Sequence, residues 1–373
     1  MNRIILIGNG FDKAHNLKTG YDDFIGWYWD KWGKRLLASS KNCEEDKLLS
    51  FKLLKKPNVE RWNQVAEYYF ADFTISAHDF IEKVRKDNSL CEIEYKSELF
   101  STICKSLKEA KWVDIENVYY SLLSKRTVEL SKRTIDPKII NDDLDYIREK
   151  LIEYLTGIQN GITDGMIKSE ILDKIKSPFD EKDISVAAMD QSPDMKMQFI
   201  RSNHAKTFLY PEKTLLLTFN YTGTADLYQR HVDYCTVNHI HGILAESDSV
   251  IFGYGDELDE HYKDIENKND NEYLRNIKSI KYLEANNYRD LLNFIESAPY
   301  QVFIMGHSCG NSDRTMLNTL FEHENCISIK PFYYINNKGK DNYIDLVQNI
   351  SRNFTDKKLM RDRVVNKNFC ETL

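Results

Sequence analysis

The sequence predicts an α/β fold in which a Rossmann-like parallel sheet is interrupted by a large, mostly helical insertion. The first observation is residues 4–7, an aliphatic run that predicts a short strand buried on both faces. The second is the stretch 42–206, where glycine is nearly absent before Gly157 and apolar residues recur at helical spacing. Strand-like runs return in number after residue 207. Because strands from both ends of the chain are expected in one sheet, the helical stretch is expected to be inserted between them.

A short glycine-containing motif follows the first predicted strand at once: Gly8-Asn9-Gly10-Phe11-Asp12. Two glycines at a strand end let the backbone turn sharply and approach a ligand closely. A helix that begins there would direct its free N–H groups at a phosphate. The dinucleotide fingerprint is incomplete, because Lys13 occupies its third glycine position and no acidic strand end follows about 20 residues later. A nucleotide-binding turn and a tight turn without a ligand remain the two alternatives, and a standard dehydrogenase is disfavoured.

The insertion is predicted from its helical periodicity. One helix is expected over residues 12–37 with an interruption near residues 17–20, and others at residues 79–84, 97–107, 112–123 and 143–158. The last has a clear apolar stripe that includes Leu144, Ile147 and Leu151. The expected domains are a discontinuous nucleotide-binding domain (1–41 and 207–335), a helical insertion domain (42–206) and a C-terminal segment (336–373).

Further strands are predicted in the second half of the chain, at residues 214–217, 236–241, 250–252, 300–305 and 325–334. Five of the predicted strands end in small or polar residues, namely Gly8, Thr218, His241, Gly253 and Gly306. In an open parallel sheet, ligands bind outside the carboxyl ends of the strands. One such end would carry little information, but the five together predict a ligand site at that edge of the sheet.

The side chains near these strand ends supply the chemistry of a candidate site. Asn220 offers a neutral amide that can hold a hydroxyl group or a water molecule. His241 can act as a general base near neutral pH. Asp12, Asp256 and Asp313 are carboxylates placed after loops. These residue types together favour a site that handles a polar ligand.

Two other arrangements stay open in the sequence. The run Gly-His-Ser-Cys-Gly around Ser308 satisfies the serine-hydrolase pattern G-x-S-x-G, but such an enzyme needs a later acid and histidine, and only His323 follows. His239 and His241 lie two residues apart, so on a strand they would face one side and form a metal pair. No third ligand is close in sequence, so one packed and one functional histidine is the preferred interpretation, and no metal is expected.

Composition excludes several classes of function. A net charge of −7 gives no basic surface, which argues against nucleic acid as the main partner. No apolar run reaches the roughly 18 residues of a membrane span, and the N-terminus lacks a signal-peptide pattern. The 7 cysteines include no C-x-x-C pair, which argues against a disulfide framework and a cysteine zinc site. A cytoplasmic location without membrane contact is expected.

Taken in order, the strand-end motifs resemble the bacteriophage abortive-infection AbiH family. The residues that carry the resemblance are Gly8-Asn9-Gly10-Phe11-Asp12, Thr218-Phe219-Asn220-Tyr221-Thr222, Ile240-His241-Gly242, Phe252-Gly253-Tyr254-Gly255-Asp256, and Gly306-His307-Ser308 with Asp313. The opening segment is the most specific of these motifs, and together they span most of the chain. The resemblance implies a role in antiviral defence.

The same order of motifs is distantly similar to the SIR2 family. There a G-A-G loop binds NAD phosphates, a T-Q-N-I-D segment places an asparagine near the nicotinamide ribose, and the histidine of an H-G pair is the base. The resemblance implies Asn220, His241 and Asp12 as catalytic residues. It implies cofactor contacts from Gly8, Asn9, Gly10, Phe11, Thr218, Tyr221, Gly253, Asp256, Gly306, His307, Ser308 and Asp313.

The paired cysteines of the sirtuin zinc module are missing here, so protein deacylation is not expected. The SIR2-like defence proteins, which hydrolyse NAD, are the better match. By this resemblance the protein is expected to be an NAD⁺ glycohydrolase with NAD as its substrate. The alternative is a nucleotide-sensing or scaffold component that binds NAD or a related nucleotide without cleaving it. A phage-derived trigger and self-association are further partners that the resemblance allows.

Overall fold

The computed structural model describes residues 1–38, 43–53, 91–110, 114–128 and 136–373. Its contacts divide the chain into two compact units. The first comprises Met1–Lys18, Leu155–Lys263 and Asn276–Leu373, and the second comprises Thr19–Tyr154 and Asp264–Arg275. Residues 155–206 thus lie with the sheet, whereas their helical pattern had grouped them with the insertion. The reason is packing, because Ile171 and Ile175 contribute to the core beneath the sheet.

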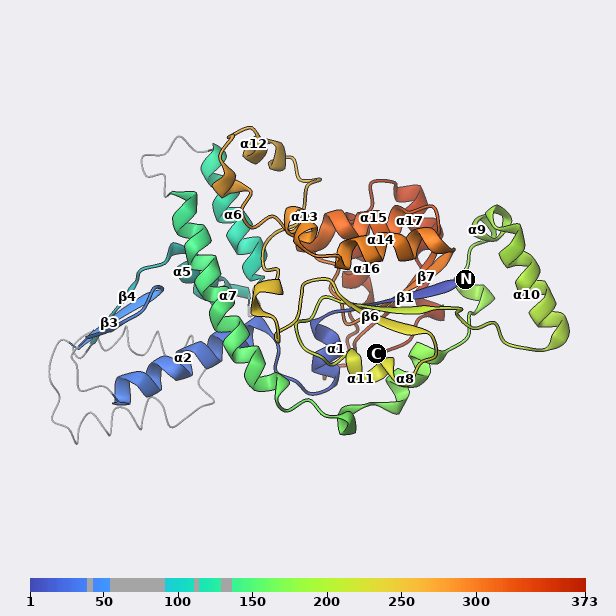
Figure 1. Ribbon diagram of the computed structural model, residues 1–373, viewed down its shortest axis with the longest axis horizontal. Coiled ribbons are helices and arrows are strands. Elements are labelled where there is room, and N and C mark those ends of the chain that lie inside the picture. The colour runs from blue at the N-terminus through green and yellow to red at the C-terminus, as the bar shows by residue number, and fades with distance from the viewer. Residues whose placement is uncertain (39–42, 54–90, 111–113, 129–135) are drawn as a thin grey trace. The chain divides into compact units, whose positions relative to one another are not determined.

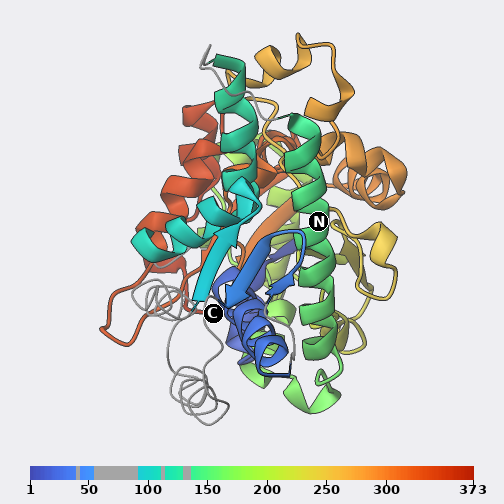
Figure 2. The same cartoon turned by 90° about the vertical axis from the view of Figure 1, so that its left-hand side faces the viewer.

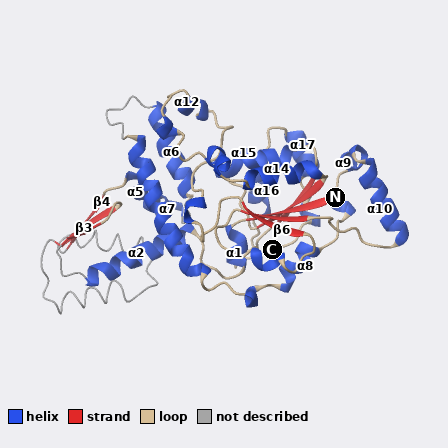
Figure 3. Cartoon of the chain, viewed as in Figure 1, coloured by secondary structure: helices blue, strands red, loops and turns tan. Residues whose placement is uncertain are grey.

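The first unit is built on a five-stranded sheet with the order β6-β5-β1-β7-β8 (Figures 1 and 3). Its strands are β1 (Asn2–Ile7), β5 (Thr214–Thr218), β6 (Cys235–His239), β7 (Tyr300–Met305) and β8 (Cys326–Phe332). Every neighbouring pair is parallel. The structure confirms the predicted α/β class and a parallel sheet of the Rossmann-like kind, with the N-terminal strand at its centre.

The central strand is buried on both faces, as its aliphatic run predicted. Ile4 and Leu6 pack on one side, with α14 (Asn287–Ser297), α15 (Arg314–Glu322) and α16 (Tyr343–Arg352). Ile5 and Ile7 pack on the other, with α1 (Asn9–Ala14), α8 (Ser169–Lys176) and α11 (Asp226–Gln229). Figure 1 shows the two groups of helices on opposite sides of the strands. The C-terminal segment therefore completes the core through α16, with α17 (Lys357–Arg363) packing beside it.

A buried polar network anchors the segment that follows α8. Arg3 on β1 donates to the main-chain carbonyls of Ile175 (3.3 Å) and Ser177 (2.5 Å). These carbonyls end a helix and would otherwise lack intrahelical donors. Asp183 pairs with Lys330 of β8 at 3.0 Å. The chain then continues into α9 (Val186–Gln191) and α10 (Pro193–Ala205).

The strand predicted at residues 250–252 does not form, so this prediction was wrong. Ile251 donates its N–H to the carbonyl of His241 (2.9 Å), and Tyr254 makes only an isolated bridge with Ile277. Val250 and Phe252 are nevertheless buried. Their apolar character reflects packing beside the sheet, and three residues are too few to separate that pattern from a strand.

The second unit contains α2 (Tyr21–Ala38), α5 (Glu98–Ala110), α6 (Ile115–Val128) and most of α7 (Pro137–Gln159), which is green in Figure 2. The helices predicted at 97–107 and 143–158 are confirmed, and the helix predicted at 112–123 is confirmed in its described part from Ile115 onward. The gap between α1 and α2 matches the predicted interruption. The helix predicted at residues 79–84 lies outside the described residues. The chain passes through α12 (Tyr262–Glu266) on entering the 264–275 segment of this unit and reaches α13 (Lys278–Lys281) after leaving it.

A small antiparallel sheet in the second unit was not predicted. It consists of β2 (Cys43–Glu45), β3 (Leu49–Leu53) and β4 (Cys91–Tyr95). The signal was present in β3, where Leu49, Phe51 and Leu53 alternate with Ser50 and Lys52. This alternation is typical of a strand with one buried face, and the helical character of the surrounding sequence masked it.

Candidate functional site

Asn220 and His241 occupy equivalent positions after two adjacent strands. Strands β5 and β6 pair in parallel with Thr218 opposite His239, and each candidate follows that pair by two residues. The turn after β5 accordingly lies against His241, with the Phe219 ring 5.2 Å from the imidazole in an edge-to-face contact. The carboxyl edge of the sheet thus places both predicted site residues just after neighbouring strands, as expected from the sequence.

His241 belongs to a buried ionic cluster, which we call the strand-end cluster (His241, Lys278, His307 and Asp313). The Asp313 carboxylate accepts from Lys278 Nζ at 2.8 Å. His241 Nε2 lies 3.3 Å from the Oδ1 atom of Asp313, and His307 Nε2 lies 3.6 Å from its Oδ2 atom. Lys278 is 0% exposed and Asp313 is 7% exposed. One carboxylate is therefore shared by a lysine and two histidines that come from separate segments.

The electrostatics of the strand-end cluster keep His241 neutral. Burial and the nearby Lys278 ammonium lower the pKa of His241 below its usual value, although Asp313 opposes them. Burial alone would raise the pKa of Asp313, but Lys278 and His241 hold it well below its ordinary range. An ionised Asp313 and a charged Lys278 then compensate each other, which leaves a neutral imidazole able to accept a proton.

His307 has a defined hydrogen-bonding state. Its Nδ1 atom accepts from the Cys309 main-chain N–H at 3.0 Å. In the neutral ring Nε2 then carries the hydrogen and points it at Asp313. The Phe219 ring lies 4.0 Å from the His307 ring, centroid to centroid. His307 therefore reaches the same carboxylate as His241, and its protonated Nε2 is not available as a metal ligand.

The glycines of the opening motif are required by a close approach between two backbone segments. A Cβ atom on Gly8 would lie 2.7 Å from His307 Cα, and one on Gly10 would lie 2.8 Å from Gly306 Cα. The Gly10 N–H donates to the Gly306 carbonyl (2.8 Å), and the Phe11 N–H donates to the Gly8 carbonyl (2.8 Å). The motif thus meets the chain after β7, and its role as a phosphate loop stays a prediction.

The other predicted residues of the first two motifs lie around this turn. Asn220 Nδ2 donates to the Gly8 carbonyl (3.0 Å), and its N–H donates to Thr218 Oγ1 (3.2 Å). Asp12 is 1% exposed and accepts from Thr222 Oγ1 at 2.7 Å. Asn9 begins α1 and is half-buried. Phe11 points into the core, where its ring lies 4.8 Å from that of His15, so only its backbone faces the turn.

The remaining predicted residues lie along the chain after β6 and β7. Tyr221 donates its hydroxyl to the Ile251 carbonyl (2.9 Å). Gly253 lies so close to Asn276 that a Cβ atom there would be 2.0 Å from its carbonyl oxygen. Asp256 is buried and pairs with Arg314 at 3.2 Å; burial raises its pKa while Arg314 opposes the shift.

The two alternative arrangements of the sequence do not assemble. Strand β6 ends at His239, which pairs with Asp226 (3.1 Å), so His239 and His241 do not share a strand face. Within the described ranges, no three His, Cys, Asp or Glu side chains are placed to hold a metal ion. Ser308 is exposed after the carboxyl end of β7, whereas His323 contacts Tyr300 at the start of β7 and pairs with Glu296. The serine-hydrolase pattern is therefore a turn sequence.

Sequence reasoning missed Lys278 and Tyr282. Lys278 is on α13, and Tyr282 follows it in a short 3₁₀ turn, with its hydroxyl 3.1 Å from His241 Nε2. Both belong to a stretch, Lys278–Tyr282, whose two lysines and polar neighbours look like a solvated surface. A lone lysine carries no sign of burial in sequence, because lysine is almost always exposed.

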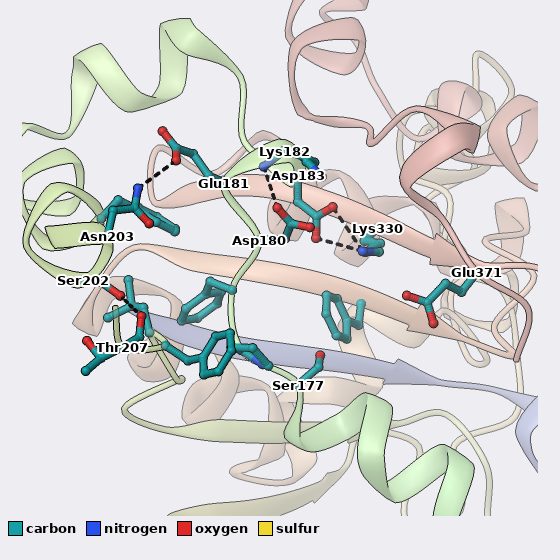
Figure 4. A pocket seen from close by; sticks show the side chains of 16 residues that line it. Ser177, Asp180, Glu181, Lys182, Asp183, Ser202, Asn203, Thr207, Lys330 and Glu371 are labelled. Carbon is teal, nitrogen blue, oxygen red and sulfur yellow. Dashed lines mark hydrogen bonds and ion pairs between the residues drawn. The ribbon is translucent and has the colours of Figure 1, made fainter. Parts of the chain in front are cut away.

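A cavity of about 650 Å³ lies elsewhere in the first unit (Figure 4). Its volume falls in the ligand-pocket range of about 300–1,000 Å³, and Phe303 and Lys330 form part of its wall. Its polar groups bond to one another: Lys330 to Asp183 (3.0 Å), Asn203 to Glu181 (3.3 Å) and the Ser202 hydroxyl to the Thr207 carbonyl. None of the predicted strand-end residues lines it. The cavity and the strand-end cluster are separate features.

Buried neutral histidines make stability depend on pH. Burial lowers the pKa values of His15 and His241, whereas an unfolded histidine protonates near pH 6.5. The unfolded state therefore binds more protons than the folded state as the pH falls from about 7.5 to 5.5. The free energy of unfolding drops by up to about 1.4 kcal/mol per pH unit for each such histidine. Urea unfolding at both pH values measures this drop. His15→Asn should reduce it and the exposed His204→Asn should not; an unchanged dependence in His15→Asn would contradict the assignment.

In the described part of the chain, no helix has both the length and the apolar character that a bilayer crossing requires.

The comparisons with known proteins identify the family. No curated protein and no solved structure matched the chain. The family model described as "Bacteriophage abortive infection AbiH" matches residues 4–334, from the central strand β1 to just beyond β8. That family implies a role in abortive-infection defence against phage. The chain belongs to the bacteriophage abortive infection AbiH family.

Proposed function

We propose that the protein acts in abortive infection by cleaving the bond between nicotinamide and ribose in NAD⁺. The observation that carries the proposal is that Asn220 and His241 occupy equivalent positions after adjacent parallel strands, with His241 beside the buried Asp313 carboxylate. Ligands of open parallel sheets bind at this edge. The order of motifs, with an asparagine segment followed by a His-Gly pair, supports NAD⁺ as the substrate through its similarity to SIR2-like defence proteins.

The leaving group in this reaction needs no proton from the protein, because nicotinamide departs as a neutral molecule. When the C1′–N1 bond breaks, its electron pair neutralises the positive nicotinamide ring, and the ribose passes through an oxocarbenium-like state similar to that of glycoside cleavage. Water then bonds to C1′ and gives up a proton. His241 is the proposed acceptor of that proton, directly or through a ribose hydroxyl group, because its imidazole is neutral at rest. Asn220 is proposed to orient the water or the ribose.

The test measures nicotinamide released from NAD⁺ by the purified protein, by chromatography. Asn220→Ala is expected to lower the rate about 10²-fold, in line with the loss of one positioning group. Asn203→Ala is the matched control. This exposed asparagine lies on α10, and its side-chain amide donates to the Glu181 carboxylate. Equal rates in Asn220→Ala and wild type would overturn the role of Asn220.

A second candidate function is a nucleotide-sensing or scaffold component. The observation that favours it is that polar groups at the strand ends already bond to one another, with the Gly10 N–H on Gly306 and the Asp313 carboxylate on Lys278. Under this alternative, calorimetry detects NAD⁺ or ADP-ribose binding by the wild type without release of nicotinamide. Release of nicotinamide by the wild type excludes it.

A further inference from the structure

We propose that Lys278 and Asp313 form a positioning pair for His241, in which the carboxylate orients the imidazole and the lysine offsets the negative charge that would otherwise favour the imidazolium form at rest. Its catalytic consequence rests on the proposed function, whereas its effect on His241 itself does not. Neither residue is required to touch the substrate. The pair is a property of the chain's own packing at the carboxyl edge of the sheet.

The contacts of Asp313 carry the first step. The carboxylate follows β7 through a 3₁₀ turn (Asn311–Asp313), and its Oδ1 atom faces both Lys278 Nζ (2.8 Å) and His241 Nε2 (3.3 Å). Tyr282 contributes a hydroxyl at 3.1 Å from the same imidazole nitrogen. A buried imidazole with a carboxylate and a hydroxyl at one nitrogen has a restricted orientation, which is what a general base requires.

The charges carry the second step. Among the described residues, the titratable and charged groups that face His241 include Asp313, Lys278, His307, the Tyr282 hydroxyl and Tyr221, whose ring lies 6.3 Å from the imidazole. A carboxylate alone beside a buried histidine would favour the imidazolium form. Lys278, with no exposed surface, compensates that carboxylate. When water is deprotonated during the reaction, the proton moves to His241, and Asp313 then faces a positive ring.

The positioning pair differs from an ordinary structural ion pair in what it predicts. Removing the lysine leaves Asp313 uncompensated, so the pKa of His241 rises. Removing the carboxylate charge takes away the group that raises the pKa of His241 and keeps the Lys278 ammonium that lowers it, so this pKa falls. Each shift is expected to be about one unit or more, the size typical of a charge within 4–6 Å. An ion pair that did not act on the imidazole would leave its titration midpoint unchanged in both variants.

The experiment is an NMR titration of the full-length protein with ¹³Cε1-labelled histidine, in which His241→Gln identifies the resonance. Lys278→Met should raise and Asp313→Asn should lower the His241 titration midpoint, whereas exposed His204 serves as an internal reference that stays fixed. Lys281→Met, on the next turn of α13 with an exposed partner in Glu284, is the matched control and should leave His241 unchanged. Shifts in one common direction, or none, would overturn the proposal.

A double variant protects the test against misfolding. Lys278→Met with Asp313→Asn leaves no unpaired buried charge, so it should fold where a single variant fails, and its His241 midpoint should lie between those of the two single variants. If NAD⁺ is cleaved, the acidic limb of the pH–rate profile should move to higher pH in Lys278→Met, because the pKa of His241 is raised. If no variant and no wild type cleaves NAD⁺ while the opposite shifts are observed, the positioning pair stands and the proposed function fails.

Discussion

The His241→Ala variant is expected to release nicotinamide from NAD⁺ about 10²- to 10⁴-fold more slowly than the wild type, the range measured for loss of a general base. The imidazole follows the strand next to the one that Asn220 follows, and burial together with Lys278 keeps it unprotonated near pH 7. A neighbouring residue cannot take its place, because His307 already accepts the Cys309 N–H at Nδ1 and carries its hydrogen on Nε2. The rates are compared by chromatography at pH 7.5.

His239→Ala is the matched control for this variant. His239 is the last residue of β6, two residues before His241, and its side chain pairs with Asp226 (3.1 Å) instead of joining the strand-end cluster. Its removal should leave the rate within a few-fold of the wild type. A His241→Ala protein that is folded and fully active would show that the imidazole is a packing residue.

The Gly306→Ala variant is expected to be destabilised by at least about 3 kcal/mol, since two costs combine at this position. Gly306 has a φ angle of +79°, which non-glycine residues rarely adopt. A Cβ atom would also lie 2.1 Å from the Phe11 nitrogen and 2.5 Å from the Gly10 carbonyl carbon. The two backbone segments would have to separate, which removes the hydrogen bond from Gly10 to Gly306. Urea unfolding followed by circular dichroism measures the loss.

Gly157→Ala provides the opposite control. Gly157 lies in the last turn of α7, and apart from its chain neighbours and the backbone of its own helix no described heavy atom is within 4 Å of the Cβ position that alanine would fill. Alanine in a helix interior is favoured over glycine by about 0.8–1 kcal/mol, so this variant should be slightly more stable than the wild type. If Gly306→Ala proved as stable as Gly157→Ala, the tight packing between the two strand-end turns would be incorrect.

The sequence predicted most of the sheet because buried parallel strands leave a strong signal. The aliphatic runs at residues 4–7, 214–217 and 300–305 became β1, β5 and β7, and they lie side by side. Polar residues at their carboxyl ends meet because strand direction is shared in a parallel sheet. This rule alone brings Asn220, His241, His307 and Asp313 to one edge.

The parts that sequence reasoning missed depend on tertiary packing. The run at residues 250–252 is apolar because it is buried beside the sheet, and nothing local separates that cause from strand formation. Lys278 is buried with its ammonium on the carboxylate of Asp313, which lies 35 residues later in the chain. The opening glycines left a nucleotide-binding turn and a tight turn without a ligand as alternatives, and neither predicted the close approach of the chain after β7 that the structure shows. Spacing in sequence does not reveal which partner approaches.

We propose that the strand-end site consumes NAD⁺ during defence. The decisive experiment measures cellular NAD⁺ after phage infection in cells that carry the wild-type protein or His241→Ala. We expect NAD⁺ to fall before lysis with the wild type and to stay constant with His241→Ala, together with loss of protection. Protection by the wild type with unchanged NAD⁺ would contradict the account.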